Sequence, residues 1–170
     1  MKNASSLGIC LLLTATSPLF AGDWPQWRGA DRDGKSTDTG LLKQWPTDGP
    51  KLLWKKTGLG KGYSSVAAVA DHLYTMGDND EASQLLALSA TDGKILWSAK
   101  VGKAGAPGWG GFGGPRCTPT VDKQLIFAVD QWGQLVCVQT ANGKEQWRKN
   151  YAEDFGATRP EWAWCETGIS

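Results

Sequence analysis

One unit of about fifty residues occurs twice in this chain. Residues 85–97 return as residues 135–147, and each copy ends in a tryptophan, Trp97 in the first and Trp147 in the second. The offset between the copies is 147 − 97 = 50 residues. A repeat of this length constrains the fold more than local propensity does, because each copy forms the same supersecondary unit and buries its apolar face against its neighbour.

Each copy contains four short runs of strand-forming residues, and turn residues separate the runs. Asp92-Gly93 and Asn142-Gly143 lie between the last two runs of each copy. Such pairs favour tight hairpin turns because they tolerate a positive φ. The predicted strands are residues 65–68, 73–76, 85–88 and 95–99 in the first copy and residues 118–121, 125–129, 135–138 and 145–149 in the second.

Four antiparallel strands in a unit of this length are typical of one blade of a β-propeller. Leucine-rich and ankyrin repeats are much shorter, and the 3.6-residue period of helical repeats is absent. The sequence therefore predicts an all-β fold of β-propeller blades, each a four-stranded antiparallel sheet, and an incomplete propeller with about two full blades. Residues 51–54 repeat the pattern of residues 94–97, which predicts one further outer strand at residues 51–56 without the rest of its blade.

The Gly-Lys-x-x-Trp ending of each copy resembles the tryptophan-docking motif of the pyrroloquinoline-quinone (PQQ)-like repeat family. This family contains β-propellers related to quinoprotein alcohol dehydrogenases and to an outer-membrane assembly lipoprotein. Ala87 lies six residues before the motif glycine in the first copy, and Cys137 has the same position in the second. Residues 23–29, 40–43 and 45–46 are similar to the N-terminal segment of secreted bacterial members. The resemblance implies a structural role in docking one blade on the next for Ala87, Gly93, Trp97, Gly143, Trp147 and Trp54.

The resemblance covers residues 22–170 and divides the chain into parts. Members of the family typically have about six to eight blades. We therefore expect an N-terminal fragment whose remaining propeller blades are missing, and the alternative is a short chain that assembles blades from several copies. The expected parts are a signal peptide (1–21), an N-terminal segment with the lone outer strand (22–62), a first blade (63–103), a glycine-rich loop with the second blade (104–150), and a loop with the start of a third blade (151–170).

The first 21 residues have the pattern of a secretory signal peptide. Lys2 precedes an apolar stretch at residues 7–15, and Ala21 is a small residue at the expected cleavage position. We therefore expect export to the periplasm or the extracellular space. The apolar stretch is shorter than the roughly 20 residues of a membrane-spanning helix, so no membrane span is expected. The formal net charge of +1 gives no support for nucleic acid as a partner.

Cysteine and histidine are too sparse for a zinc or haem site. His72 is the single histidine, and no CxxC pair occurs. Once the signal peptide and its Cys10 are removed, three cysteines remain, and in an oxidising compartment one disulfide is one interpretation and buried thiols are the other. These three are Cys117, Cys137 and Cys165.

Two other motifs lack the context that would give them a function. Residues 108–113 satisfy GxGxxG, but a strand-like run follows them instead of the helix that a dinucleotide-binding turn needs. We interpret residues 104–115 as a long glycine-rich loop that carries Trp109 and Phe112, either for packing or as part of a ligand surface. The acidic residues at 78–81 lack the alternating ligands and the glycine of an EF-hand, so we interpret them as a solvated turn and expect no metal site.

In the resembled fold the inner strand of each blade lines a central channel, and ligands bind at its mouth. The residues that lead into these strands are therefore the candidates for a ligand site, with Arg116 and Glu166 as its main polar groups. The alternative for these two residues is an ion pair between blades. The full candidate set at the channel mouth is Tyr63, Ser64, Arg116, Cys117, Arg159, Glu161, Trp164 and Glu166.

The resemblance implies two candidate functions. The first is a binding or protein-interaction scaffold, whose partners are other proteins or a small polar ligand at the channel mouth and which has no demonstrable cofactor. The second is a periplasmic quinoprotein dehydrogenase that oxidises an alcohol or a sugar with PQQ and calcium. Such enzymes hold PQQ with a disulfide between adjacent cysteines, a stacking tryptophan and a calcium site of Glu, Asn and Asp. The sequence has no adjacent cysteines, so PQQ and calcium belong only to the second function, and catalytic residues are unassigned.

Overall fold

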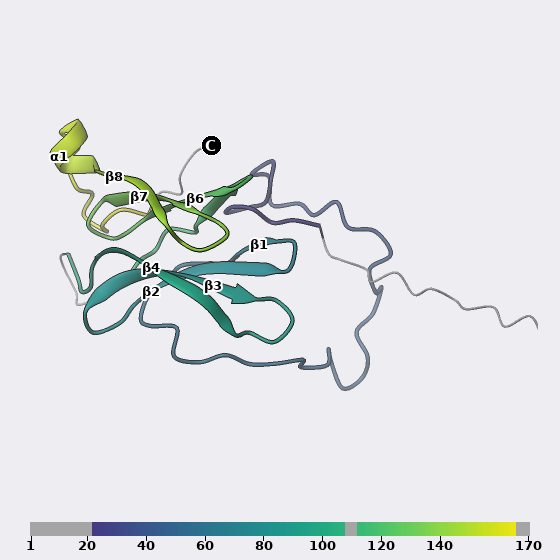
Figure 1. The fold of residues 1–170 in the computed structure, drawn as a ribbon. Coiled ribbons are helices and arrows are strands. Elements are labelled where there is room, and N and C mark those ends of the chain that lie inside the picture. The colour runs from purple at the N-terminus through teal and green to yellow at the C-terminus, as the bar shows by residue number, and fades with distance from the viewer. Residues whose placement is uncertain (1–21, 108–111, 166–170) are drawn as a thin grey trace, which may run out of the picture.

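The computed structural model describes residues 22–107 and 112–165, which form two four-stranded antiparallel sheets (Figure 1). The first sheet contains, in this order, β1 (Ala67–Val69), β2 (His72–Asp78), β3 (Ala82–Ser89) and β4 (Ile95–Lys103). The second sheet contains, in this order, β5 (Thr120–Asp122), β6 (Leu125–Val129), β7 (Gln134–Gln139) and β8 (Glu145–Asn150). A short helix, α1 (Tyr151–Phe155), follows β8.

The two sheets have the same register in their outer halves, which confirms the predicted fold of propeller blades built from four antiparallel strands. Ala87 pairs with Trp97 across β3 and β4, and Cys137 pairs with Trp147 across β7 and β8. A β-bulge follows each of these pairs at the same place. A bulge increases the local twist of a sheet, so both sheets twist more strongly at this place.

The outer hairpins differ from the predicted tight turns. Only the glycine of each Asx-Gly pair has a positive φ, 68° at Gly93 and 69° at Gly143. The amide of Gly93 donates to the oxygen of Ser89, four residues earlier, and Gly143 bonds to Gln139 in the same way. Each loop is therefore one helical-type turn closed by a left-handed glycine. The prediction of a primed two-residue turn is wrong, because that turn needs a positive φ at both central residues.

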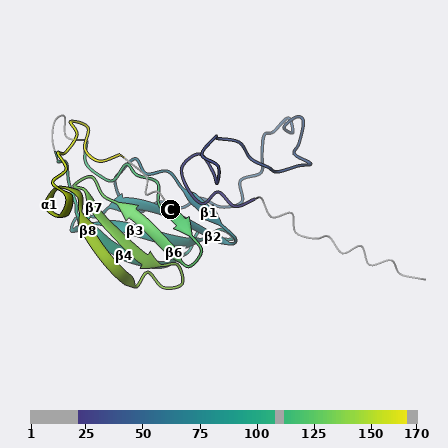
Figure 2. The same ribbon diagram turned by 90° about the horizontal axis from the view of Figure 1, so that it is seen from above.

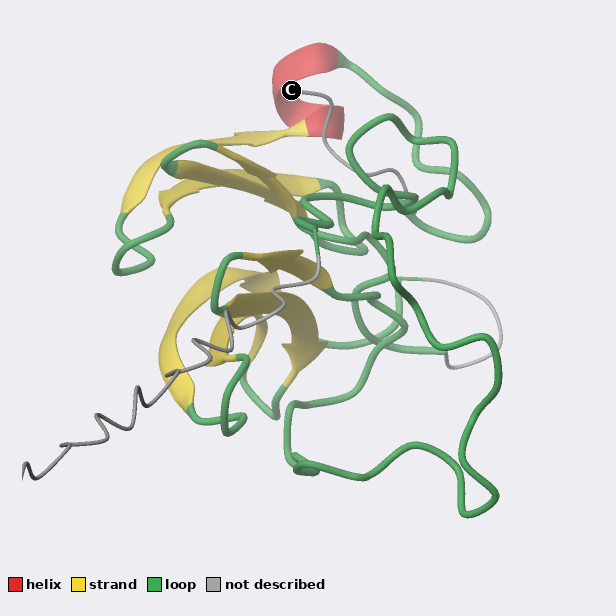
Figure 3. Ribbon diagram, turned by 90° about the vertical axis from the view of Figure 1, so that its right-hand side faces the viewer, coloured by secondary structure: helices red, strands yellow, loops and turns green. Residues whose placement is uncertain are grey.

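The main core lies between the two sheets, which are stacked face to face (Figures 2 and 3). Alternate residues of a strand point to the same face, so each strand contributes every second residue to this layer. Each fully buried Leu, Ile or Val adds about 1.5–3 kcal/mol relative to an exposed side chain. The first sheet contributes Tyr74, Met76, Leu85, Ala87 and Val101, and the second contributes Val121, Ile126, Ala128, Val136 and Val138.

The N-terminal segment is irregular, and the predicted outer strand at residues 51–56 is not formed. A strand exists only where a neighbouring strand pairs with its backbone, and no described residue provides that neighbour. The segment instead contacts the inner strands near its start. Trp24 forms an isolated antiparallel bridge with Ala68 of β1, and the oxygen of Pro25 accepts from the amide of Val121 in β5.

Helix α1 replaces part of the loop that we expected after the second sheet. The side chain of Asn150 caps it by accepting from the amides of Ala152 and Glu153, at 3.0 and 3.2 Å. Among the described residues, no helix is long and apolar enough to span a membrane. The predicted signal peptide, Trp109 and the predicted start of a third blade at residues 166–170 lie outside the described residues.

Candidate functional site

The functional residues predicted from the sequence lie mostly at one end of the two sheets. The turn between β2 and β3, the connection from β4 to β5 and the turn between β6 and β7 share this end, together with the residues before β1. We call it the mouth end, because it corresponds to the predicted channel mouth. Figure 3 shows the long loops gathered beside the stacked sheets.

Two tryptophans dock in the same way on glycines of the outer hairpins. Trp97 of β4 lies on Gly143 of the second sheet, and its Nε1 donates to the backbone oxygen three residues before that glycine, at 3.0 Å. Trp54 lies on Gly93, and its Nε1 makes the equivalent bond at 2.9 Å. A Cβ would lie 2.5 Å from the indole at Gly143 and 2.7 Å at Gly93, so both contacts need glycine.

Trp147 has the place of Trp97 in the second sheet. The Phe127 and Trp147 rings lie 6.0 Å apart with 46° between their planes, and the Tyr74 and Trp97 rings lie 6.0 Å apart with 42°. Trp147 is nevertheless 42% exposed. The two indoles therefore have the same setting within their own sheets and differ in what covers their outer side.

An exposed aromatic cluster lies at the mouth end, formed by Tyr63, Phe112 and Arg116. The Tyr63 and Phe112 rings meet edge to face, with centroids 6.4 Å apart, and the Arg116 guanidinium lies 5.4 Å from the Tyr63 ring centroid. Arg116 also donates from Nη1 to the oxygen of Gly114 at 2.9 Å and from Nη2 to the oxygen of Phe112 at 2.8 Å. The arginine therefore holds the end of the glycine-rich loop beside Tyr63. We call these three residues the mouth cluster.

Ser64, Cys117 and Trp164 connect the segments that lead into successive inner strands. Ser64 Oγ donates to the oxygen of Cys117 at 2.7 Å and accepts from the amide of Met76 at 3.3 Å. Cys117 Sγ donates to the oxygen of Trp164 at 3.6 Å. Cys117 and Cys137 are buried thiols, Cys165 is an exposed thiol, and burial raises the pKa of Cys137.

Trp164 covers the outer side of the second sheet. Its ring meets Tyr151 edge to face at 4.8 Å and lies against Gly133, where a Cβ would be 2.5 Å from Nε1. Trp164 is only 7% exposed, so its ring faces are used in packing. Arg159 and Glu161 are exposed, and within the described residues neither forms an ion pair. Glu166, the predicted partner of Arg116, lies outside the described residues.

The interpretation of residues 78–81 as a solvated turn is wrong for Asp78, which is 5% exposed. Its Oδ2 accepts from the amide of Gly105 at 2.7 Å and from Nε2 of Gln131, a residue of the turn between β6 and β7, at 2.9 Å. Asp78 and Gln131 have the same place in the two repeats, since 131 − 78 = 53, and a polar residue after the second strand of both copies was the available signal. The burial arises because the two sheets meet there.

Asp130 is a second buried carboxylate at this junction. Its Oδ1 accepts from the amides of Trp132 and Gln134 at 2.9 and 2.8 Å, which shapes the turn between β6 and β7. Its pKa is raised to about 6, mainly by burial and in smaller part by the nearby Asp78 carboxylate, while the two amide hydrogen bonds oppose the change. Sequence reasoning missed this residue.

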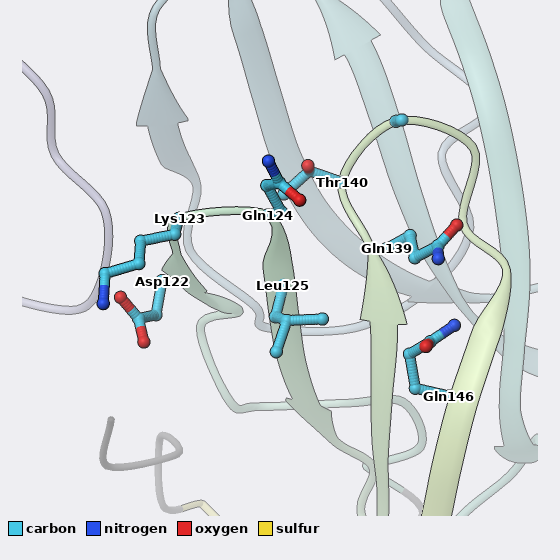
Figure 4. A pocket seen from close by; sticks show the side chains of 8 residues that line it. Asp122, Lys123, Gln124, Leu125, Gln139, Thr140 and Gln146 are labelled. Carbon is cyan, nitrogen blue, oxygen red and sulfur yellow. The ribbon is translucent and has the colours of Figure 1, made fainter.

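Two pockets lie at opposite ends of the sheets. One of about 680 Å³ lies at the mouth end, between the N-terminal segment and the glycine-rich loop, and its lining includes Lys61, Tyr63 and Asp78. The other, of about 1060 Å³, lies at the far end beside the turns that precede β6 and β8 (Figure 4). None of the predicted site residues lines the second pocket.

The family profile described as "Outer membrane protein assembly factor BamB" matches residues 35–161. The chain belongs to this family. The BamB protein of Shewanella oneidensis is 34% identical over 79 residues, which are 46% of this chain and 19% of that relative. The resemblance to the PQQ-like repeats is thereby confirmed.

Two solved structures illustrate what this chain is similar to. The quinohemoprotein alcohol dehydrogenase of Comamonas testosteroni has a TM-score of 0.55 and 17% identity, over 78% of this chain and 20% of the enzyme. BamB from Moraxella catarrhalis has a TM-score of 0.42 and 10% identity, over 59% of this chain and 28% of that protein. The chain thus spans about a fifth of the curated BamB relative, and the likeness to the dehydrogenase shows the fold alone.

In this BamB-family chain, two of the predicted site residues, Trp164 and Cys117, are already used in contacts that a bound PQQ would have to replace. The ring of Trp164 is packed between Tyr151 and Gly133 and offers no open face for stacking. The Cys117 thiol donates to a backbone oxygen. Among the described residues, no three Asp, Glu, His or Cys side chains gather as metal ligands.

Proposed function

We propose that this chain is part of an exported β-propeller that acts as a protein-interaction scaffold in the cell envelope, and that the mouth cluster is one of its contact surfaces. The observation that carries this proposal is the arrangement of Tyr63, Phe112 and Arg116. Tyr63 is 59% exposed and Phe112 is 54% exposed, so two large rings face solvent side by side at the mouth end.

The composition of the mouth cluster is typical of a protein-binding hot spot. Tyrosine and arginine are enriched among the residues that contribute most to protein interfaces. The two backbone bonds of Arg116 hold its guanidinium and the Phe112 segment before a partner arrives. Such preorganisation lowers the entropic cost of binding, because fewer side chains have to be ordered in the complex.

The family supports the same class of function. The BamB relative is by name an assembly factor for outer membrane proteins, and assembly requires contacts with other proteins. We extend to this chain only the protein-binding role. Export is supported by the pattern of residues 1–21, with Lys2 followed by an apolar stretch.

Site-specific photo-crosslinking in the cell envelope tests the proposal. A photoreactive amino acid replaces Tyr63 in the full-length protein, and a matched variant carries it at Phe155 of α1, which is equally exposed at 63%. We expect discrete crosslinks to a protein partner from position 63 and none to that partner from position 155. Equal crosslinking from both positions contradicts the proposal, since it indicates random collisions.

A binding measurement with the crosslinked partner gives the magnitude. Tyr63→Ala combined with Phe112→Ala is expected to weaken binding by about 1,000-fold, because hot-spot truncations cost about 2 kcal/mol each and about 4 kcal/mol together when they are additive. Phe155→Ala is expected to leave the affinity unchanged. Dye reduction by the full-length protein that requires added PQQ and Ca²⁺ would instead support the dehydrogenase and overturn the scaffold proposal.

A further inference from the structure

Four buried oxygen atoms at the junction of the two sheets have no hydrogen-bond partner among the described residues. Their residues are at most 5% exposed, so bulk water does not reach them. A buried polar atom without a partner costs free energy, and such atoms are rare in folded proteins. The four atoms are Asp78 Oδ1, Ser83 Oγ, Asp130 Oδ2 and Gln131 Oε1.

The register of the first sheet places two of these groups on one face. Asp78 pairs with Ser83 across β2 and β3, and Ser83 pairs with Gly102 across β3 and β4. Paired residues of an antiparallel sheet point to the same side, with Cβ atoms about 4.5–5.5 Å apart. Asp78 and Ser83 therefore lie next to each other in a row that ends at Gly102.

The second sheet brings the other two groups to this row. Asp130 Oδ2 lies against Gly102 so closely that a Cβ on that glycine would overlap it. Gln131 Nε2 donates to Asp78 Oδ2 at 2.9 Å, which places the Gln131 side-chain amide at the Asp78 carboxylate. The residues that carry the orphan oxygens therefore adjoin one another at this junction, and Gly102 makes room for the Asp130 carboxylate.

The two buried carboxylates of this cluster need a positive charge to balance them. Ionised carboxylates and an amide oxygen can accept hydrogen bonds but cannot donate them. The Ser83 hydroxyl supplies the one donor of the cluster. Among the described residues, no Lys, Arg or His forms an ion pair with Asp78 or Asp130. Arg148, which approaches Asp130, uses its guanidinium on Glu145 and on the oxygens of Val101 and Lys100.

We propose that this junction is a calcium site that links the two sheets, with the carboxylates of Asp78 and Asp130, the Ser83 hydroxyl and the Gln131 amide oxygen as ligands. Calcium binds carboxylate, amide and hydroxyl oxygens in flexible geometry, and water completes its shell where the protein offers fewer ligands. Two carboxylates balance the double positive charge. The proposal does not depend on the protein-interaction function.

Terbium luminescence tests the site, because Tb³⁺ replaces Ca²⁺ at oxygen sites and emits when a nearby tryptophan is excited. Trp132 is two residues from Asp130 and its amide donates to that carboxylate, so it is placed to sensitise the ion. In the purified, chelator-treated chain we expect sensitised emission that saturates at one Tb³⁺ per chain and that Ca²⁺ displaces. Trp132→Phe should reduce the emission without reducing Ca²⁺ affinity in calorimetry.

Ligand variants distinguish this site from ions bound loosely at the surface. Asp78→Asn and Asp130→Asn are expected to weaken Ca²⁺ binding by about tenfold or more, since each removes one of two charged ligands. Asp80→Asn, an exposed carboxylate in the adjacent turn, is the matched control and should bind as the parent does. Equal effects from all three variants overturn the proposal.

Stability provides a readout that does not need the aspartate variants to fold. Ca²⁺ is expected to raise the Tm of the parent chain with the logarithm of its concentration above the Kd, and to raise it less in Ser83→Ala, which removes a neutral ligand. A Tm that millimolar Ca²⁺ does not change, at a pH at which both carboxyls are ionised, overturns the proposal. Stabilisation on acidification without a calcium effect also overturns it, because the two carboxyls would then share a proton.

Discussion

The indole of Trp97 lies on the backbone of Gly143, so that the outer strand of one sheet is held against the outer hairpin of the next. The contact requires glycine at position 143 for two reasons. Its φ of 69° is in the left-handed region, and the space that a Cβ would fill belongs to the indole.

Gly143→Ala is therefore expected to destabilise the chain by about 2–5 kcal/mol, the sum of about 1–2 kcal/mol for the left-handed backbone and about 1–3 kcal/mol for overpacking. Urea unfolding measures the free energy change. Gly156→Ala is the matched control, because Gly156 has a φ of 65° but no atom within 4 Å of an added Cβ. Equal losses in both variants would show that the indole contact contributes nothing.

Trp97→Phe and Trp147→Phe are expected to differ although the two residues have the same place in the repeat. Trp97→Phe removes the hydrogen bond from the indole to the backbone oxygen of Thr140 and should cost about 1–3 kcal/mol. Trp147 is 42% exposed, and its substitution should cost less than about 1 kcal/mol. Thermal or urea unfolding of both variants checks the order, and a larger loss for Trp147→Phe contradicts it.

The Asp92 carboxylate is expected to make the unfolding free energy of the chain depend on pH in the acid range. Hydrogen bonds from the side chain and the backbone of Lys94 lower its pKa from the ordinary 3.8 to about 2 in the folded chain. Because the folded protein favours the ionised form, this contribution is complete above pH 4 or so and is lost as the pH falls through about 2. Asp92→Asn should flatten the fall in unfolding free energy across this range, whereas Asp31→Asn, which removes one exposed charge, should not.

Arg116→Lys tests whether the arginine orders the mouth cluster. Lysine keeps the charge but has no planar guanidinium. It therefore cannot donate to the oxygens of both Phe112 and Gly114 while it lies near the Tyr63 ring. We expect amide exchange at residues 112–114 to rise roughly tenfold, which corresponds to about 1.4 kcal/mol. Arg159→Lys, on an exposed segment, should leave this exchange unchanged, and an unchanged rate in Arg116→Lys contradicts the ordering role.

The sheets themselves were predictable from sequence because the information is local and repeated. Alternation of apolar residues, Asx-Gly pairs and a tryptophan at a constant spacing each constrain a few neighbouring residues, and two copies supported one interpretation. The outer strand at residues 51–56 has the same local pattern and is still not a strand. Its backbone lacks a neighbour among the described residues, which no property of the segment itself reveals.

What only the tertiary structure decided is which side chains from distant segments share an environment. Asp78 reads as a turn residue, yet Gln131 and Gly105 approach from the turn between β6 and β7 and the glycine-rich loop and bury it. Tyr63 and Arg116 were predicted together, but their contact with Phe112 depends on the path of the intervening loop. Burial and charge are properties of the packed assembly of sheets, because they depend on where water is excluded, and the order of residues along one chain does not specify that by itself.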